Sequence, residues 1–142
     1  MNIVLDTNVF ISAVLWTGLP HEALKLIFAS FQLVQSPETL VELENVLKRK
    51  KFQEILLKRN LDVGTIMKSL LMQCEVYTVS ANTKRKMNTI SIDDTDDLIF
   101  IGLALEAHAK YIVSGDEHLL KLKRTFDIDI LTVQQFLGKS KS

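Results

Sequence analysis

Residues 2–13 read NIVLDTNVFISA, and this stretch decides how the rest of the chain is interpreted. A short, mostly apolar run from Asn2 to Leu5 ends in Asp6. Thr7 or Asn8 can cap a helix that starts directly afterwards. The stretch therefore predicts a buried strand followed at once by a helix, with a carboxylate at the junction between them.

The same alternation continues to the end of the chain. Apolar runs at 31–35, 75–79, 111–113 and 128–132 predict four more strands. Helical spacing of apolar side chains, with caps and prolines at the starts, predicts helices between them and a last helix through Phe136, whereas the polar segment 80–91 predicts a loop. Because no hairpin turn signal separates the strands, we expect an α/β fold, a three-layer α/β/α sandwich around a central parallel sheet of about five strands.

Length and composition limit the possible classes of protein. The 142 residues suit a single domain over 1–142, and 47% hydrophobic with 24% charged residues is typical of a packed globular chain. The formal net charge is zero, so only local clusters could favour nucleic acid. A single Cys74 cannot form an intramolecular disulfide, no apolar run is long enough to span a bilayer, and no basic residue precedes the apolar start. A cytoplasmic protein without a membrane segment is expected.

Four acids stand at positions where a parallel sheet would gather them. Asp6 follows the first strand and Asp116 follows the fourth, and ligands of such sheets bind beyond the carboxyl ends of the strands. Glu42 lies in the second turn of a predicted helix, and Asp97 begins the helix before the fourth strand. Carboxylates that converge without a cation repel each other, so the arrangement predicts divalent metal, with oxygen ligands that suit Mg²⁺ or Mn²⁺. Such ions can support hydrolysis of a phosphodiester by water.

Each acid also has a purely structural interpretation. A carboxylate at a helix start can cap free amides or interact with the helix dipole, an acid after Ser-Gly is common in turns, and a helical glutamate is usually solvated. Asp6 could be such a cap, and Asp94, Asp96 and Asp97 could interact with the helix dipole. Asp116 is the acid that follows Ser-Gly, and Glu42 is the helical glutamate. The joint placement of the acids favours the metal site.

The sequence resembles the PIN-domain family, and four stretches in order carry the resemblance. The first is the strand that ends in Asp-Thr-Asn-Val, and the second is a helix that places the family's glutamate at position 42 rather than 38 or 44. The third is an acidic run that leads into an apolar helix, and the fourth is a strand followed by Ser-Gly-Asp. The four stretches are residues 3–13, 40–52, 94–105 and 111–120, which together extend over most of the chain.

The resemblance implies a specific activity and site. PIN domains bind Mg²⁺ or Mn²⁺ and typically cleave single-stranded RNA, so the chain is expected to be a metal-dependent endoribonuclease. Many small prokaryotic members are toxins of type II toxin–antitoxin pairs, which implies a possible cognate antitoxin and a homodimer. The family's catalytic metal ligands correspond to Asp6, Glu42, Asp97 and Asp116, with Asp94 as an auxiliary acid and Asn8 and Ser114 as polar residues that orient an acid or a water.

One motif departs from the family pattern. The third stretch has Thr95 where proline is frequent and Leu98 where a polar residue is frequent, which leaves Asp96 and Asp97 both as candidates for the third acid. Asp97 is preferred because it stands seven residues before Ala104, the spacing expected in the family.

Other functions fit the sequence less well. An aspartyl phosphatase needs a second acid two residues after its nucleophile, where Asn8 stands, and a receiver domain needs an acid after the third strand, where residues 77–79 supply none. The remaining alternative is a non-catalytic PIN-like module that binds RNA or a protein, against which the presence of all four acids argues.

Overall fold

The computed structural model describes residues 1–90 and 97–140, and its centre is a six-stranded sheet in the order β3-β2-β1-β4-β6-β5. The strands β1, β2, β3, β4 and β6 run parallel to their neighbours, and only β5 is antiparallel, to β6. The expected central parallel sheet of about five strands is confirmed. The strands are β1 (Asn2–Leu5), β2 (Gln32–Gln35), β3 (Glu75–Val76), β4 (Tyr111–Val113), β5 (Arg124–Thr125) and β6 (Ile128–Leu131).

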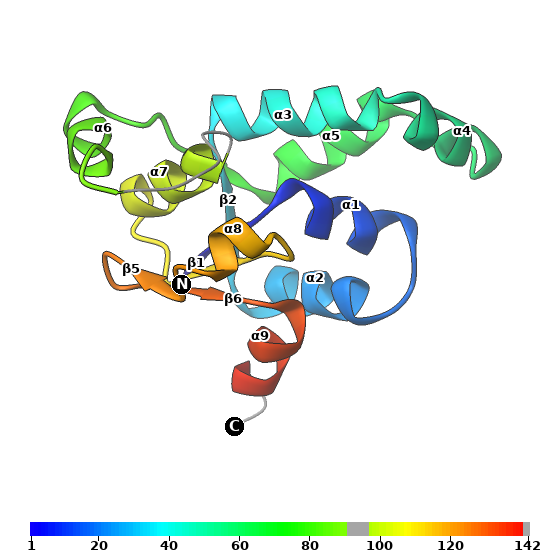
Figure 1. The fold of residues 1–142 in the computed structure, drawn as a ribbon. Coiled ribbons are helices and arrows are strands. Elements are labelled where there is room, and N and C mark those ends of the chain that lie inside the picture. The colour runs from blue at the N-terminus through cyan, green and yellow to red at the C-terminus, as the bar shows by residue number, and fades with distance from the viewer. Residues whose placement is uncertain (91–96, 141–142) are drawn as a thin grey trace.

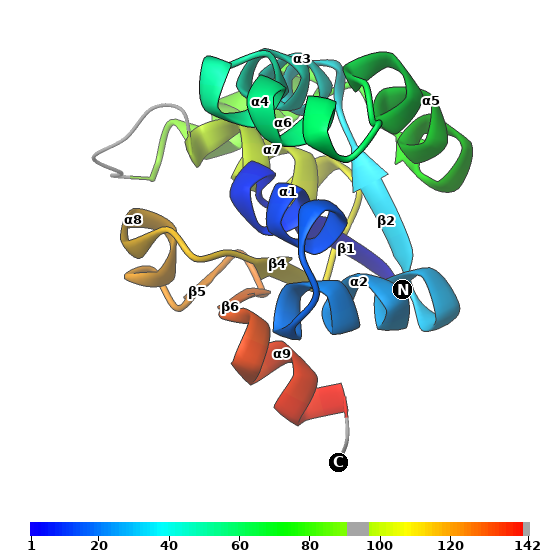
Figure 2. The same cartoon turned by 90° about the vertical axis from the view of Figure 1, so that its right-hand side faces the viewer.

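Helices cover the sheet as the alternating sequence predicts (Figure 1). Figure 2 shows α3, α4 and α5 together at the top of the view, and α2 and α9 together at the bottom. The helices of the described chain are α1 (Thr7–Leu15), α2 (Leu19–Ser30), α3 (Pro37–Leu47), α4 (Lys50–Lys58), α5 (Val63–Gln73), α6 (Ala81–Met87), α7 (Leu98–Glu106), α8 (Glu117–Leu120) and α9 (Val133–Ser140).

Two apolar cores form because successive strand residues point to opposite faces of the sheet. Ile3 and Leu5 of β1 belong to the core that α1, α2, α3, α5 and α9 complete. Val4, between them, belongs to the second core, to which α7 contributes Ile101 and Leu103. The three-layer sandwich therefore follows from the alternation within a strand of four residues.

The segment predicted as a loop at 80–91 contains a helix instead, α6. Ser80 is its N-cap, since the Ser80 side chain accepts a hydrogen bond from the Thr83 amide at 3.2 Å. The Glu106 carboxylate accepts from the Ser80 amide at 2.7 Å and from the Thr83 hydroxyl at 2.8 Å, which ties α6 to α7. The loop prediction was wrong because this helix depends on a contact 26 residues away, which local polarity does not reveal.

Replacing Glu106 with glutamine is expected to loosen α6 in a pH-dependent way. The hydrogen bonds from Ser80 and Thr83 hold the pKa of Glu106 below its ordinary value. A lowered folded pKa means that the carboxylate stabilises the fold above the ordinary glutamate range, and that this contribution is lost as the pH falls through the folded pKa. Hydrogen exchange of the α6 amides should be faster in the variant at pH 7, and the difference from wild type should shrink on acidification. The control variant Glu54→Gln, on α4, should exchange like wild type at both pH values.

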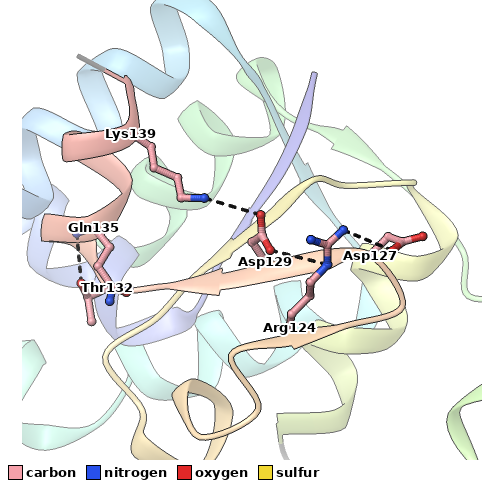
Figure 3. A network of polar contacts seen from close by, with 6 residues as sticks. All are labelled: Arg124, Asp127, Asp129, Thr132, Gln135 and Lys139. Atoms are coloured by element: carbon pink, nitrogen blue, oxygen red, sulfur yellow. Dashed lines mark hydrogen bonds and ion pairs between the residues drawn. The ribbon is translucent and has the colours of Figure 1, made fainter. Parts of the chain in front are cut away.

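A short hairpin at the sheet edge was also missed. The turn between β5 and β6 places Phe126 and Asp127 at positive φ, 49° and 64°. Two-residue hairpin turns usually contain Asn-Gly or Asp-Gly, and a phenylalanine at the first position does not indicate a turn in the sequence. Figure 3 shows the ion pairs that hold the hairpin, in which Asp129 of β6 lies 3.8 Å from Arg124 and 3.7 Å from Lys139 of α9.

Candidate active site

The candidate site lies where the strand order reverses. From β1 the chain proceeds to β2 and β3 on one side, and β4 then pairs with the other side of β1, with Leu5 opposite Val113. The Asp6 amide donates to the Val113 carbonyl at 3.0 Å, so the ends of the two strands are joined directly. In open α/β sheets this reversal point is where ligands bind. Asp6 and Asp116 can meet only if the strands that precede them are neighbours, and β1 and β4 are neighbours in the sheet.

Asp6 is held rigidly in a buried position, with 5% of its surface exposed. One carboxylate oxygen accepts from the Val9 amide at 2.8 Å and so caps α1. The structural interpretation of Asp6 as a cap is therefore correct, and the expected caps Thr7 and Asn8 lie inside the helix. The other oxygen accepts from the Ser114 hydroxyl and from the Gly115 amide, the latter at 3.2 Å. Donors on three sides fix the orientation of this carboxylate before anything binds.

Burial raises the pKa of Asp6, because an ionised group in the interior loses its hydration. The hydrogen bonds from Ser114, Val9 and Gly115 act in the opposite direction, and the nearby charge of Asp116 raises the pKa further. The net increase means that the buried negative charge is only partly compensated by the protein. A bound cation would supply the missing compensation.

Ser114 links the two acids that follow the central strands. Its side chain is fully buried, and its hydroxyl donates to Asp6 while accepting from the Asp116 amide at 2.9 Å. Asp116 is the N-cap of α8 and accepts from the His118 amide at 2.7 Å. The structure thus brings Ser114, Asp6 and Asp116 together.

Glu42 reaches the same end of the sheet through a partner that the sequence argument did not select. Thr7 is buried, and its hydroxyl donates to a Glu42 carboxylate oxygen at 2.5 Å. Thr7 directly follows Asp6, and this contact holds the glutamate of α3 toward α1. The signal for this role is the position of Thr7 beside Asp6 in the first motif, although the sequence predicts only a possible helix cap at Thr7.

Asp97 lies directly before α7 and is buried, with 5% of its surface exposed. Its side chain caps no amide of α7, a helix that is described throughout, so capping does not explain the burial of this acid. Asp94 and Asp96 lie outside the described residues. The preference for Asp97 over Asp96 therefore stays a prediction.

A groove of about 340 Å³ opens beside Asp6 and Asp116. Asp6 and Asp116 line it together with Asn8, which is exposed on the first turn of α1. Its other lining residues are Val9, Ser12, Pro20, Gly115 and Val133. Glu42, which Thr7 holds beside α1, and Asp97, which directly precedes α7, do not line this groove.

The oxygen-rich donor set fits a hard cation that keeps much of its hydration. Within residues 1–90 and 97–140, no three His, Cys, Asp or Glu side chains are grouped closely enough to hold a metal ion by themselves. A carboxylate has about four acceptor positions. Three of those on Asp6 accept the hydrogen bonds from Val9, Ser114 and Gly115, which leaves one for a cation. Mg²⁺ typically takes one or two protein carboxylates and completes its shell with water and phosphate. Asp6 and Asp116 can serve a cation of this kind.

Comparisons with known proteins agree with this architecture. The structure resembles VapBC2 from Rickettsia felis, solved bound to a DNA fragment from its promoter, with a TM-score of 0.64, 20% identity, and coverage of 92% of this chain and 97% of that one. It also resembles DNA-bound VapBC from Salmonella typhimurium (0.63, 17% identity, 94% and 98% covered) and VapC20 of Mycobacterium tuberculosis, a toxin that cleaves the sarcin–ricin loop (0.54, 14% identity, 89% and 98% covered). No curated protein sequence matches the chain. At these identities the structural likeness establishes a shared fold.

A family model gives the assignment that structural likeness alone does not. The PIN-domain model matches residues 2–118, a range that includes all four stretches on which the resemblance rests except the last two residues of the fourth. The buried Asp6 at the end of β1, its link through Ser114 to Asp116, and the parallel strands β1, β2, β3 and β4 all lie within the matched range, whereas β6 lies beyond it. The chain therefore belongs to the PIN-domain family.

Proposed function

We propose that this protein is a metal-dependent endoribonuclease that hydrolyses phosphodiester bonds of single-stranded RNA, and that it is the toxin of a type II toxin–antitoxin pair. The observation that carries the proposal is the buried, partly compensated carboxylate of Asp6, which shares a groove with Asp116 at the reversal point of the sheet. The likeness to VapBC structures and to a toxin that cleaves the sarcin–ricin loop supports the toxin role. A cognate antitoxin and a homodimer are the proposed protein partners, in the cytoplasm. Among the described helices, none has the length and hydropathy needed to cross a membrane.

Each residue of the site has a defined task in this proposal. Asp6, Glu42, Asp97 and Asp116 would hold Mg²⁺ or Mn²⁺, with Asp94 as an auxiliary acid. Bound ions of this type lower the pKa of a coordinated water and neutralise charge on the phosphate. No side chain needs to become covalently attached to the RNA.

The polar neighbours of the acids keep them in place. Ser114 and the Gly115 amide fix one oxygen of Asp6, and Thr7 fixes Glu42. Asn8 lines the groove and is exposed to solvent, so its side-chain amide is available to orient a water or a phosphate oxygen. This pre-set arrangement reduces the reorganisation required when RNA binds.

Cleavage of labelled single-stranded RNA by the wild-type chain and by Asp97→Asn tests the proposal, each with Mn²⁺, Mg²⁺ or EDTA. Cleavage that requires metal and is lost in the variant would support the nuclease. A folded wild-type chain that cleaves in no condition would favour the alternative, a PIN-like module that binds RNA or protein without catalysis. That alternative is kept because no three metal-binding side chains are grouped among the described residues.

Addition of millimolar Mn²⁺ is expected to raise the melting temperature by several degrees. A ligand at about 100 times its dissociation constant stabilises the folded state by about 2.7 kcal/mol. The buried charge of Asp6 is the group whose compensation supplies part of this effect. Differential scanning fluorimetry with Mn²⁺, Mg²⁺ and Ca²⁺ measures the melting temperature, and NaCl at the same ionic strength is the control. An unchanged melting temperature with every divalent ion would argue against a metal site.

A further inference from the structure

A second, smaller pocket lies between α3, α6 and α7, with a volume of about 180 Å³. Its walls are mainly apolar, and Met87, Leu98, Ile99 and Gly102 provide them. Two charged side chains, those of Glu38 and Lys84, stand among these residues. An apolar slot with a few polar groups is the usual form of a small-molecule site, although this one is smaller than the roughly 300–1,000 Å³ of drug-sized ligands. Its size suits a single flat ring system.

The pocket lies beside the proposed catalytic acids. Glu38 precedes Glu42 by one helical turn on α3, so the two side chains share a face of that helix. Leu98 directly follows the buried Asp97 at the start of α7. A group bound in the pocket is therefore adjacent to the end of the sheet at which cleavage is proposed.

The third wall, α6, is basic and closely attached to α7. Lys84, Arg85 and Lys86 are all exposed, and none takes part in an ion pair between described residues. A Cβ added at Gly102 would come within 2.8 Å of the Met87 sulfur, so the absence of a side chain at Gly102 lets α6 pack this closely. Available cations next to an apolar slot are what a single-stranded nucleic acid requires, with the phosphates on the cations and a base in the slot.

We infer that this pocket binds a guanine base of the RNA, next to the phosphate that is cleaved. The inference rests on the proposed nuclease function and adds a base preference to it. The Watson–Crick edge of guanine carries two adjacent N–H donors beside one carbonyl acceptor, and proteins read unstacked RNA bases on this edge. The Glu38 carboxylate can accept from both donors, and the Lys84 ammonium can donate to the carbonyl. Adenine has no carbonyl and no ring N–H donor on this edge, cytosine has no ring N–H donor, and uracil offers a single donor between two acceptors.

Methionine-methyl NMR can test the pocket without any cleavage. The chain has four methionines, and Met87 alone among them lines this pocket, while Met72 is 79% exposed on α5 and serves as an internal control. The full chain with ¹³C-methyl methionine, in EDTA, is titrated with GMP, AMP, CMP and UMP. We expect the Met87 signal to shift with GMP at the lowest concentration, because a base ring against the sulfur changes its magnetic environment, and the Met72 signal to stay in place.

Variants separate base recognition from simple contact. Glu38→Gln should weaken GMP binding about tenfold, since one well-placed pair of hydrogen bonds to a base contributes on that scale. Glu22→Gln is the matched control, because both are exposed glutamates in the first turn of a helix with proline at its start. A Met87 signal that no nucleotide moves, or that all four move equally in wild type and Glu38→Gln, would overturn the inference.

Cleavage maps then distinguish failure of this inference from failure of the proposed function. If the wild-type chain cuts RNA next to guanine and Glu38→Gln cuts without that preference, both stand. Cutting without any guanine preference overturns the inference and leaves the nuclease. Selective GMP binding by a chain that cuts no RNA retains the pocket and rejects the nuclease.

Discussion

Asp6→Asn is expected to lower metal-dependent cleavage of single-stranded RNA by at least about 100-fold, since loss of even an outer partner of a metal ligand costs about 10- to 100-fold. Asparagine keeps the shape of the side chain and can still cap α1 through its amide oxygen. It removes the charge that would hold a cation, and it presents a donor where Ser114 and Gly115 also donate. The measurement is the initial rate of cleavage with saturating Mn²⁺, with circular dichroism to verify the fold.

The matched control for this experiment is Asp62→Asn. Asp62 also caps a helix, α5, and accepts from the Thr65 amide at 2.7 Å, much as Asp6 accepts from Val9. Asp62 is exposed, lies in the connection between α4 and α5, and does not line the groove of Asp6 and Asp116. Cleavage should be unchanged in this variant. Equal activity of wild type and Asp6→Asn would reduce Asp6 to a structural cap.

The structure also explains why a structural and a metal-binding interpretation of Asp6 need not compete. A carboxylate has two oxygens, and Asp6 uses one for the amide of α1 and turns the other toward Ser114 and Gly115. Capping positions the side chain, while burial leaves its charge partly uncompensated. A sequence pattern can identify both roles, but it cannot show that one residue fulfils them simultaneously.

The sheet could be predicted because short stretches of the sequence are enough to identify its strands. A short apolar run before Asp6, and another before Ser114, each identify a strand, and the alternation of strands and helices implies a parallel sheet. Adjacency of β1 and β4 then followed only from the structure, through the pairing of Leu5 with Val113. The contact between Thr7 and Glu42 spans 35 positions, and the position of Thr7 beside Asp6 does not indicate which distant residue it contacts.

The elements that were missed depend on distant or unusual contacts. Helix α6 is anchored by Glu106, and the β5–β6 turn uses Phe126 and Asp127 at positive φ without the residues that normally mark such turns. The third strand was predicted to extend to Val79 but ends at Val76, because the chain leaves the edge of the sheet to form α6. In each case tertiary contacts decided a segment whose own propensity is weak.

Phe136→Ala is expected to destabilise the protein by about 3–5 kcal/mol, the usual cost of removing a buried phenylalanine side chain. Phe136 on α9 is fully buried and packs edge-on against Phe31, with ring centroids 5.4 Å apart, and against Tyr111 at 6.1 Å. A total stability of about 5–15 kcal/mol is typical of a domain, so this one change would consume a large part of it. Urea unfolding monitored by circular dichroism gives the free energy, and Gln134→Ala, exposed on the same helix, is the control and should lie within about 0.5 kcal/mol of wild type.

The result decides whether residues 1–142 act as one domain. The family model ends at residue 118, before α9, yet Phe136 belongs to the core that Ile3 and Leu5 of β1 begin. If α9 is an integral part of that core, Phe136→Ala should lower the unfolding midpoint for the entire chain in a single transition. A variant that unfolds like wild type, or that loses α9 in a separate earlier transition, would mean that the central sheet is stable without its last helix.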